Sequence, residues 1–119
     1  MDFKALLALQ LAMTRQTWQA MTERGATEET LLNLDFFYVA SGREEAARLS
    51  GFLQRETDYT VSANPESENE LSLREWSVAG TTSPTTVSLD ILLAWVRWMV
   101  LAGQENGPCE FDGWGAQLA

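Results

Sequence analysis

The stretch that decides the fold is PCEFDGWGAQL, at residues 108–118. Its first half alternates apolar and acidic side chains, the period of a half-buried strand: Cys109, Glu110, Phe111 and Asp112. Two glycines, Gly113 and Gly115, then flank Trp114. Glycine occurs where a backbone needs a positive φ or approaches another surface closely. Trp114 is therefore either a plug in the core or an exposed ring, and we favour the core.

Six further elements precede this final strand. An apolar stripe predicts a helix over residues 2–24, made by Phe3, Leu7, Leu11, Trp18 and Met21. The other five predicted elements are, in order, a strand at 31–40, a helix that ends near Glu56, strands at 59–63 and 71–79 around the turn NPESEN at 64–69, and an apolar helix from about 88 to 103.

The order after the first helix is strand, helix, strand, strand, helix, strand, which is the split β-α-β-β-α-β pattern. Right-handed crossovers then predict a four-stranded antiparallel sheet with both helices on one face. The strands at 31–40 and 109–118 become neighbours in this sheet. We therefore expect an α+β, ferredoxin-like sandwich in one domain over residues 1–119, with a helix at 1–24 added to a core at 31–118.

The helix at 88–103 is apolar nearly all round, so it must be covered on more than one side. Its second stripe consists of Ile91, Trp95, Trp98 and Ala102. We expect the N-terminal helix to cover this stripe, in which case a monomer suffices. The alternative is a contact with another chain, and bare Trp95 and Trp98 side chains would predict a homodimer.

The composition limits the classes of function that this chain can have. The chain has 17 acidic and 8 basic residues and a net charge of −9, which disfavours direct binding to nucleic acid. We favour the interpretation that this charge keeps a small protein soluble, and the alternative is that it attracts a basic partner. It has no histidine, which excludes the common catalytic triads and most zinc sites.

The chain has one cysteine, Cys109, which cannot form an internal disulfide. This is consistent with a protein in a reducing compartment, and we expect Cys109 to be a buried structural thiol. Neither a secretory signal nor a membrane span is predicted at the N-terminus.

The carboxylates are the remaining candidates for chemistry. Strand geometry predicts Glu110 and Asp112 on one face, roughly 7 Å apart, where a pair of acids could perform hydrolysis if their pKa values differed. We favour a solvated pair instead, because no base, nucleotide loop or metal-ligand spacing accompanies it. With Trp114 on the same face, the three residues would form an acidic protein-binding patch with an aromatic centre. We expect no catalytic residue, cofactor or metal.

The motif EFDGWG, with the helix, link and aromatic strand in MTERGATEETLLNLDFFYV, resembles the regulator of ribonuclease activity B family, the ribonuclease E inhibitor proteins. The matching motif residues are Glu110, Phe111, Asp112, Gly113, Trp114 and Gly115. The resemblance implies a ferredoxin-like domain without enzymatic activity, and an acidic cytoplasmic protein that binds ribonuclease E and lowers its activity. Two alternatives stay open: an acidic interaction or immunity-like module for another partner, and a weak hydrolase that uses Glu110 and Asp112.

Overall fold

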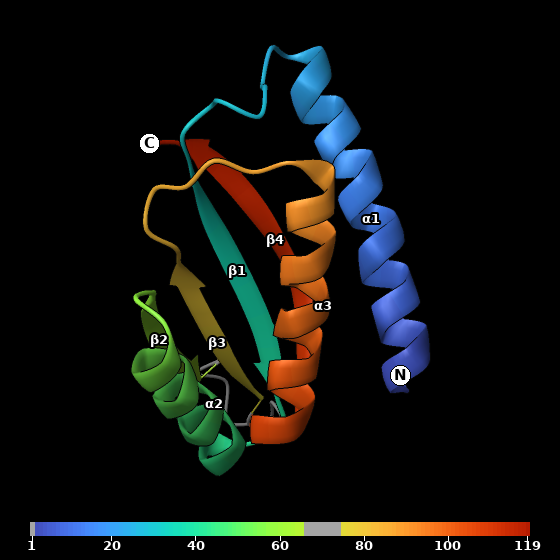
Figure 1. The fold of residues 1–119 in the computed structure, drawn as a ribbon. Helices are drawn as coiled ribbons and strands as arrows, with labels where there is room; N and C mark the ends of the chain where they lie inside the picture. Colours follow the sequence, from blue (N-terminus) through green and yellow to red (C-terminus); the bar gives the residue numbers. More distant parts are fainter. Residues whose placement is uncertain (1, 66–74) are drawn as a thin grey trace.

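The structure, a computed structural model, describes residues 2–65 and 75–119 (Figure 1). Its elements are α1 (Phe3–Glu23), β1 (Leu32–Ala40), α2 (Arg43–Glu56), β2 (Thr60–Pro65), β3 (Trp76–Thr81), α3 (Leu89–Asn106) and β4 (Cys109–Leu118). All seven agree in type and order with the expected elements. Within the expected turn at 64–69 and strand at 71–79, residues 66–74 lie outside the described residues.

The four strands form one antiparallel sheet in the order β2-β3-β1-β4. The first and last strands are neighbours, with register from Leu32 opposite Leu118 to Ala40 opposite Cys109, which confirms their expected pairing. The fold is therefore α+β, with three helices and an open sheet in the described part of the chain. In Figure 1, α2 and α3 lie over the same face of the sheet, and α1 lies beside α3.

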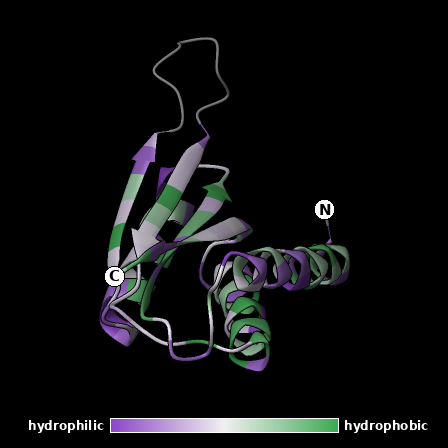
Figure 2. Cartoon of the chain, turned by 90° about the horizontal axis from the view of Figure 1, so that it is seen from above, coloured by the Kyte–Doolittle hydropathy of each residue, from purple (hydrophilic) through white to green (hydrophobic). Residues whose placement is uncertain are grey.

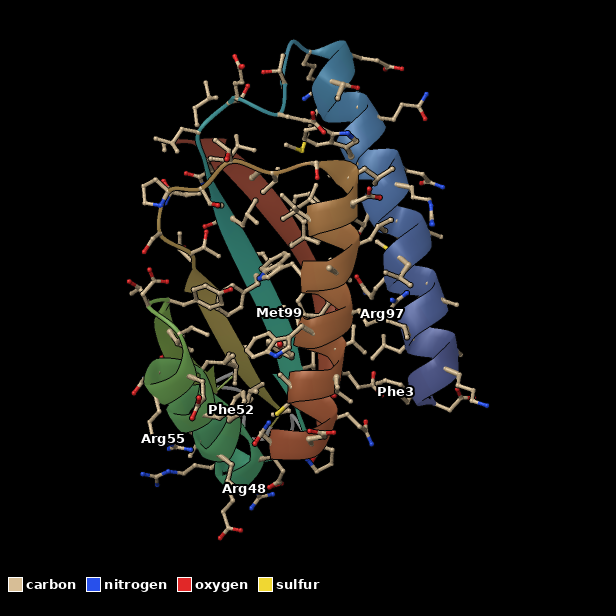
Figure 3. The ribbon with its side chains drawn as sticks, viewed as in Figure 1. Phe3, Arg48, Phe52, Arg55, Arg97 and Met99 are labelled. Atoms are coloured by element: carbon tan, nitrogen blue, oxygen red, sulfur yellow. The ribbon has the colours of Figure 1, made fainter. Side chains whose placement is uncertain are left out.

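Alternation along β1 builds the core. Five alternate residues of β1 are buried against the helices, with exposures of 3 % or less: Leu32, Leu34, Phe36, Tyr38 and Ala40. The Tyr38 hydroxyl donates a hydrogen bond to the Met99 carbonyl oxygen of α3, 2.6 Å away. Figure 3 shows Met99 on the side of α3 that faces the sheet. This bond satisfies a polar group that would otherwise be costly to bury.

The helix α1 buries an unexpected stripe. Leu6, Gln10 and Thr14 are its buried residues, four apart along one face. The expected stripe lies beside them and is partly buried against the core: Phe3, Leu7, Leu11, Trp18 and Met21. Figure 2 shows α1 beside α3, with the hydrophobic colour concentrated in the half of α1 nearer to the N-terminus.

The prediction that α1 covers Trp95 and Trp98 is wrong. Trp95 points toward the sheet, where its ring meets Phe36, Phe111 and Trp114 edge to face at centroid distances of 6.2–6.5 Å. Trp98 stacks on Phe52 of α2, with ring centroids 6.0 Å apart. Because α3 is apolar on nearly all sides, periodicity alone could not tell which neighbour covers which side. Both tryptophans are half-buried within their own chain, so the condition for the alternative, a homodimer built on bare tryptophan rings, is not met.

Candidate functional site

The EFDGWG motif lies on β4, where the strand carries a bulge. Phe37 of β1 lies opposite Gly113, while the next residue, Tyr38, lies opposite Phe111. Asp112 is therefore the extra residue of β4, a β-bulge that locally bends the strand. Gly113 adopts φ +134°, a conformation that residues with a side chain rarely adopt. The sequence expectation of a positive φ in this stretch is confirmed at Gly113.

The bulge corrects the expected arrangement of the motif. Glu110, Asp112 and Trp114 were predicted to share one face of the strand, and this is wrong. Glu110 lies opposite Val39 and is exposed, whereas Trp114 lies opposite the buried Phe36 and faces the core. One inserted residue changes the face of everything that follows it along a strand. The preferred role of Trp114 as a core residue is confirmed, and Asp112 remains exposed at the bulge.

Trp114 is held by two contacts from distant elements. Its indole N–H donates a hydrogen bond to the Thr14 hydroxyl oxygen of α1, 3.0 Å away. Its ring meets Trp95 of α3 edge to face, with centroids 6.2 Å apart. The Thr14 hydroxyl in turn donates to the Gln10 carbonyl oxygen, 2.7 Å away. The motif tryptophan therefore joins α1, α3 and the sheet.

A second hydrogen bond links α1 to β4, an edge strand of the sheet. The Gln10 side-chain amide donates to the Phe111 carbonyl oxygen of β4, 3.2 Å away and buried. Sequence reasoning missed Gln10 and Thr14 because both interrupt an apolar pattern. The available signal was their spacing: with Leu6 they fall four apart on one helical face, and polar residues on a buried face need polar partners.

A groove of about 200 Å³ lies between α1 and the bulge, and we call it the α1–β4 groove. Its lining comes from α1, β1 and β4: Gln10, Met13, Thr17, Phe37, Asp112, Gly113 and Trp114. Two apolar side chains in this lining are unusually exposed, Met13 at 44 % and Phe37 at 47 %. Leu9, one helical turn before Met13, is also 44 % exposed. Large apolar side chains that cluster on a surface are typical of interaction sites.

Carboxylates accompany these apolar side chains. Asp112 lines the groove and is exposed. Asp35 lies two residues before Phe37 on the same side of β1, and its carboxylate accepts hydrogen bonds from Thr81 at 2.7 Å and Gln117 at 3.0 Å. These bonds fix the Asp35 carboxylate without involving a cation. The open side of the sheet beside the groove therefore carries negative charge next to exposed apolar surface.

The other sequence-derived candidates are placed apart. Glu110 lines a cavity of about 390 Å³ with Cys109, while Asp112 lines the α1–β4 groove. Cys109 is buried, and desolvation, with the nearby Glu45 charge, raises the pKa of its thiol to about 11. A neutral buried thiol is unreactive at neutral pH, as expected for a structural cysteine.

Over 2–65 and 75–119, no group of three or more cysteine, aspartate and glutamate side chains is placed to hold a metal ion. None of the helices that the structure describes is long and apolar enough to cross a membrane.

Comparison with known proteins identified no relative of this chain. No model of a known protein family matches the chain, and no curated protein sequence matches it either. The function must therefore be argued from the geometry and the motif.

Proposed function

We propose that this chain is a non-enzymatic, acidic interaction domain that binds a basic protein partner in the α1–β4 groove. The observation that carries the proposal is the exposure of Met13 and Phe37 beside Asp112. Exposed apolar side chains supply binding energy when a partner covers them, at about 25 cal/mol per Å² of apolar surface buried. The carboxylates beside them select a positively charged partner.

Charge and packing both support a binding role. The net charge of −9 accelerates encounter with a basic protein and repels nucleic acid. The groove is rigidly built, because Trp114 and Gln10 are hydrogen-bonded across it to opposite elements. A preformed surface loses less conformational entropy on binding, so less of the interaction free energy is offset. Glu110 and Asp112 line different pockets, and among the described residues neither pocket lining includes a further carboxylate together with a base that would form a hydrolytic site.

The specific proposal is a protein of the ribonuclease E inhibitor type, cytoplasmic, that binds ribonuclease E and lowers its activity. The support is the motif EFDGWG at residues 110–115 and the pattern of elements around it. We also propose that the fold is ferredoxin-like, with α1 added. The support is the order β1-α2-β2-β3-α3-β4 and the central position of β1 and β3 in the sheet.

The direct test is a pull-down of purified ribonuclease E, followed by an RNA cleavage assay at moderate salt. We expect binding, inhibition of cleavage, and loss of both in Phe37→Ala and Asp112→Lys. The matched control is Ile91→Ala, because Ile91 is 53 % exposed on α3 and does not line the groove. Absence of binding and of inhibition by the unaltered chain would remove the ribonuclease E assignment.

The second candidate is an acidic interaction or immunity-like module that uses the same groove for another basic protein. The carboxylates beside Phe37 support this class without specifying the partner. Capture from a lysate by the unaltered chain, compared with capture by Asp112→Lys, separates the two proposals. A basic protein other than ribonuclease E that is lost with the variant would establish the second.

A further inference from the structure

A second cavity lies on the helix-covered side of the sheet, outside the α1–β4 groove, and encloses about 260 Å³. The connection from β3 to α3, the first turns of α3 and the residues before β2 form its walls. Behind it lie Leu34, Val87 and Leu92, each at most 2 % exposed, whereas Ile91 in the same lining is 53 % exposed. A cavity of 150 Å³ holds benzene, so this one has room for about ten non-hydrogen atoms.

In this lining, the oxygen atoms of two hydroxyl groups each accept a hydrogen bond, but neither hydroxyl donates its proton in a hydrogen bond of the described residues. The Tyr59 oxygen accepts from the Trp95 indole N–H at 2.9 Å. The Thr82 hydroxyl oxygen accepts from the Leu34 backbone N–H at 3.0 Å, and Thr82 is only 7 % exposed. A hydroxyl is both an acceptor and a donor. Over residues 2–65 and 75–119, the hydrogen bonds of the structure assign no acceptor to either proton.

The electrostatics of the same wall favour a neutral ligand. Asp58 lines the cavity, and its carboxylate accepts from the Ser83 hydroxyl at 2.8 Å. A carboxylate accepts hydrogen bonds but does not donate them, so it offers nothing to an anionic ligand and repels it. The net charge of −9 acts in the same direction. Burial raises the pKa of the Tyr59 phenol, which keeps its hydroxyl protonated, and so a donor, at neutral pH.

We propose that this cavity binds a small neutral carbonyl compound, whose oxygen accepts hydrogen bonds from Tyr59 and Thr82 and whose hydrocarbon part packs against the accessible surface of Ile91 and Trp95. Two hydroxyl donors in a lining that is otherwise largely apolar match a ketone, lactone or amide. A pure hydrocarbon would leave both donors without acceptors. This site is separate from the α1–β4 groove and does not depend on the proposed function.

Three probes of nearly the same shape test the chemistry: acetophenone, α-methylstyrene, which replaces its C=O by C=CH₂, and benzoate, which replaces its methyl group by a charged oxygen. Binding is followed by NMR through the indole N–H resonance of Trp95, because Trp95 lines the cavity. We expect acetophenone to bind about thirtyfold more tightly than α-methylstyrene, as two net hydrogen bonds predict, and benzoate to bind least. Equal affinity for ketone and alkene, preferred binding of benzoate, or no shift with any probe would overturn the proposal.

Two variants of α3 test the location. Ile91→Trp places a larger side chain at the exposed wall of the cavity and should abolish the acetophenone shift. Leu101→Trp makes the same kind of change at another exposed position of α3, 40 % exposed and outside the cavity lining, and should leave the shift unchanged. A shift that survives Ile91→Trp, or that Leu101→Trp abolishes equally, would show that acetophenone binds elsewhere.

Discussion

The indole N–H of Trp114 donates a hydrogen bond to the hydroxyl of Thr14, which lies 100 positions earlier in the sequence, with 3.0 Å between nitrogen and oxygen. Thr14 is fully buried, so this bond lies where water cannot replace it. It fastens the motif of the last strand to the first helix, which has few other contacts with the sheet.

Replacement of Thr14 by valine should therefore destabilise the fold. Thr14→Val keeps the shape of the side chain but leaves the Trp114 N–H without a partner, which costs about 1–3 kcal/mol. Thr17→Val is the control, because the Thr17 hydroxyl also bonds back along α1, to the Met13 carbonyl oxygen at 3.0 Å, but this bond is exposed and Thr17 is only partly buried. Its effect should stay within about 0.5 kcal/mol. Urea unfolding measures both, and equal losses would contradict this account of the Trp114 bond.

The two glycines beside Trp114 should differ in their sensitivity to substitution. Gly113→Ala forces a side chain onto φ +134° and should cost about 1–3 kcal/mol of unfolding free energy. Gly115→Ala should cost little, because Gly115 has no positive φ and a Cβ there would meet nothing within 4 Å. Thermal unfolding of the two variants provides the comparison. A similar midpoint for both would mean that the bulge can relax.

The helical glycines provide a second matched pair. A Cβ at Gly103 of α3 would lie 2.6 Å from the Cys109 carbonyl oxygen and 2.7 Å from the Tyr38 ring, so Gly103→Ala should destabilise by about 1–3 kcal/mol through overpacking. A Cβ at Gly51 of α2 would meet only the flexible end of Arg55, at 3.3 Å. Gly51→Ala should stabilise by up to about 1 kcal/mol through helix propensity. Chemical denaturation measures the sign of the change in unfolding free energy for both variants. Destabilisation by Gly51→Ala would argue against the described packing of α2.

Alkaline pH should weaken the fold. Burial raises the pKa of the Cys109 thiol from 9.0 to about 11 and raises that of the Tyr38 phenol above its ordinary value of 10.0. Groups with raised folded pKa values contribute full stability below their unfolded pKa values and lose it as the pH rises toward the folded ones. The free energy of unfolding should therefore fall between about pH 9 and pH 11.

The pH effect can be assigned by substitution. Cys109→Ala removes the thiol and should flatten the decrease between about pH 9 and pH 11. Tyr38→Phe removes the phenol and should flatten the decrease above pH 10. The relevant quantity is the slope of unfolding free energy against pH, which is separate from any loss of packing at pH 7. An unchanged slope in both variants would contradict the burial of these groups.

Local pattern predicted the elements well because each carries its own signal. Alternation placed the last strand at residues 109–118, and the crossover rule placed it beside β1. The bulge was not predicted, since one extra residue leaves the alternation of Cys109 to Asp112 unchanged and becomes visible only against Phe37 and Tyr38 of the partner strand.

Long-range partners account for the other differences. Periodicity gives the buried face of a helix but not the element that covers it, so Trp95 and Trp98 were assigned to the wrong neighbour. For the same reason the α1–β4 groove could not be predicted, because its walls come from three elements that the chain separates widely. The predicted common face of Glu110, Asp112 and Trp114 failed for the same reason, since the bulge turns Trp114 toward the core while Glu110 and Asp112 stay exposed.

The pairing of β1 with β4 also constrains how the chain acquires its structure during synthesis. The register joins Leu32 to Leu118, so a central strand of the sheet lacks one of its two neighbours until the ribosome has released β4. Until then α1 has neither the Phe111 carbonyl nor the Trp114 indole to bind. Contacts this distant in sequence slow folding and expose apolar surface to aggregation while they are unmade. The nascent chain is therefore most in need of chaperone protection after α3 emerges and before β4 does.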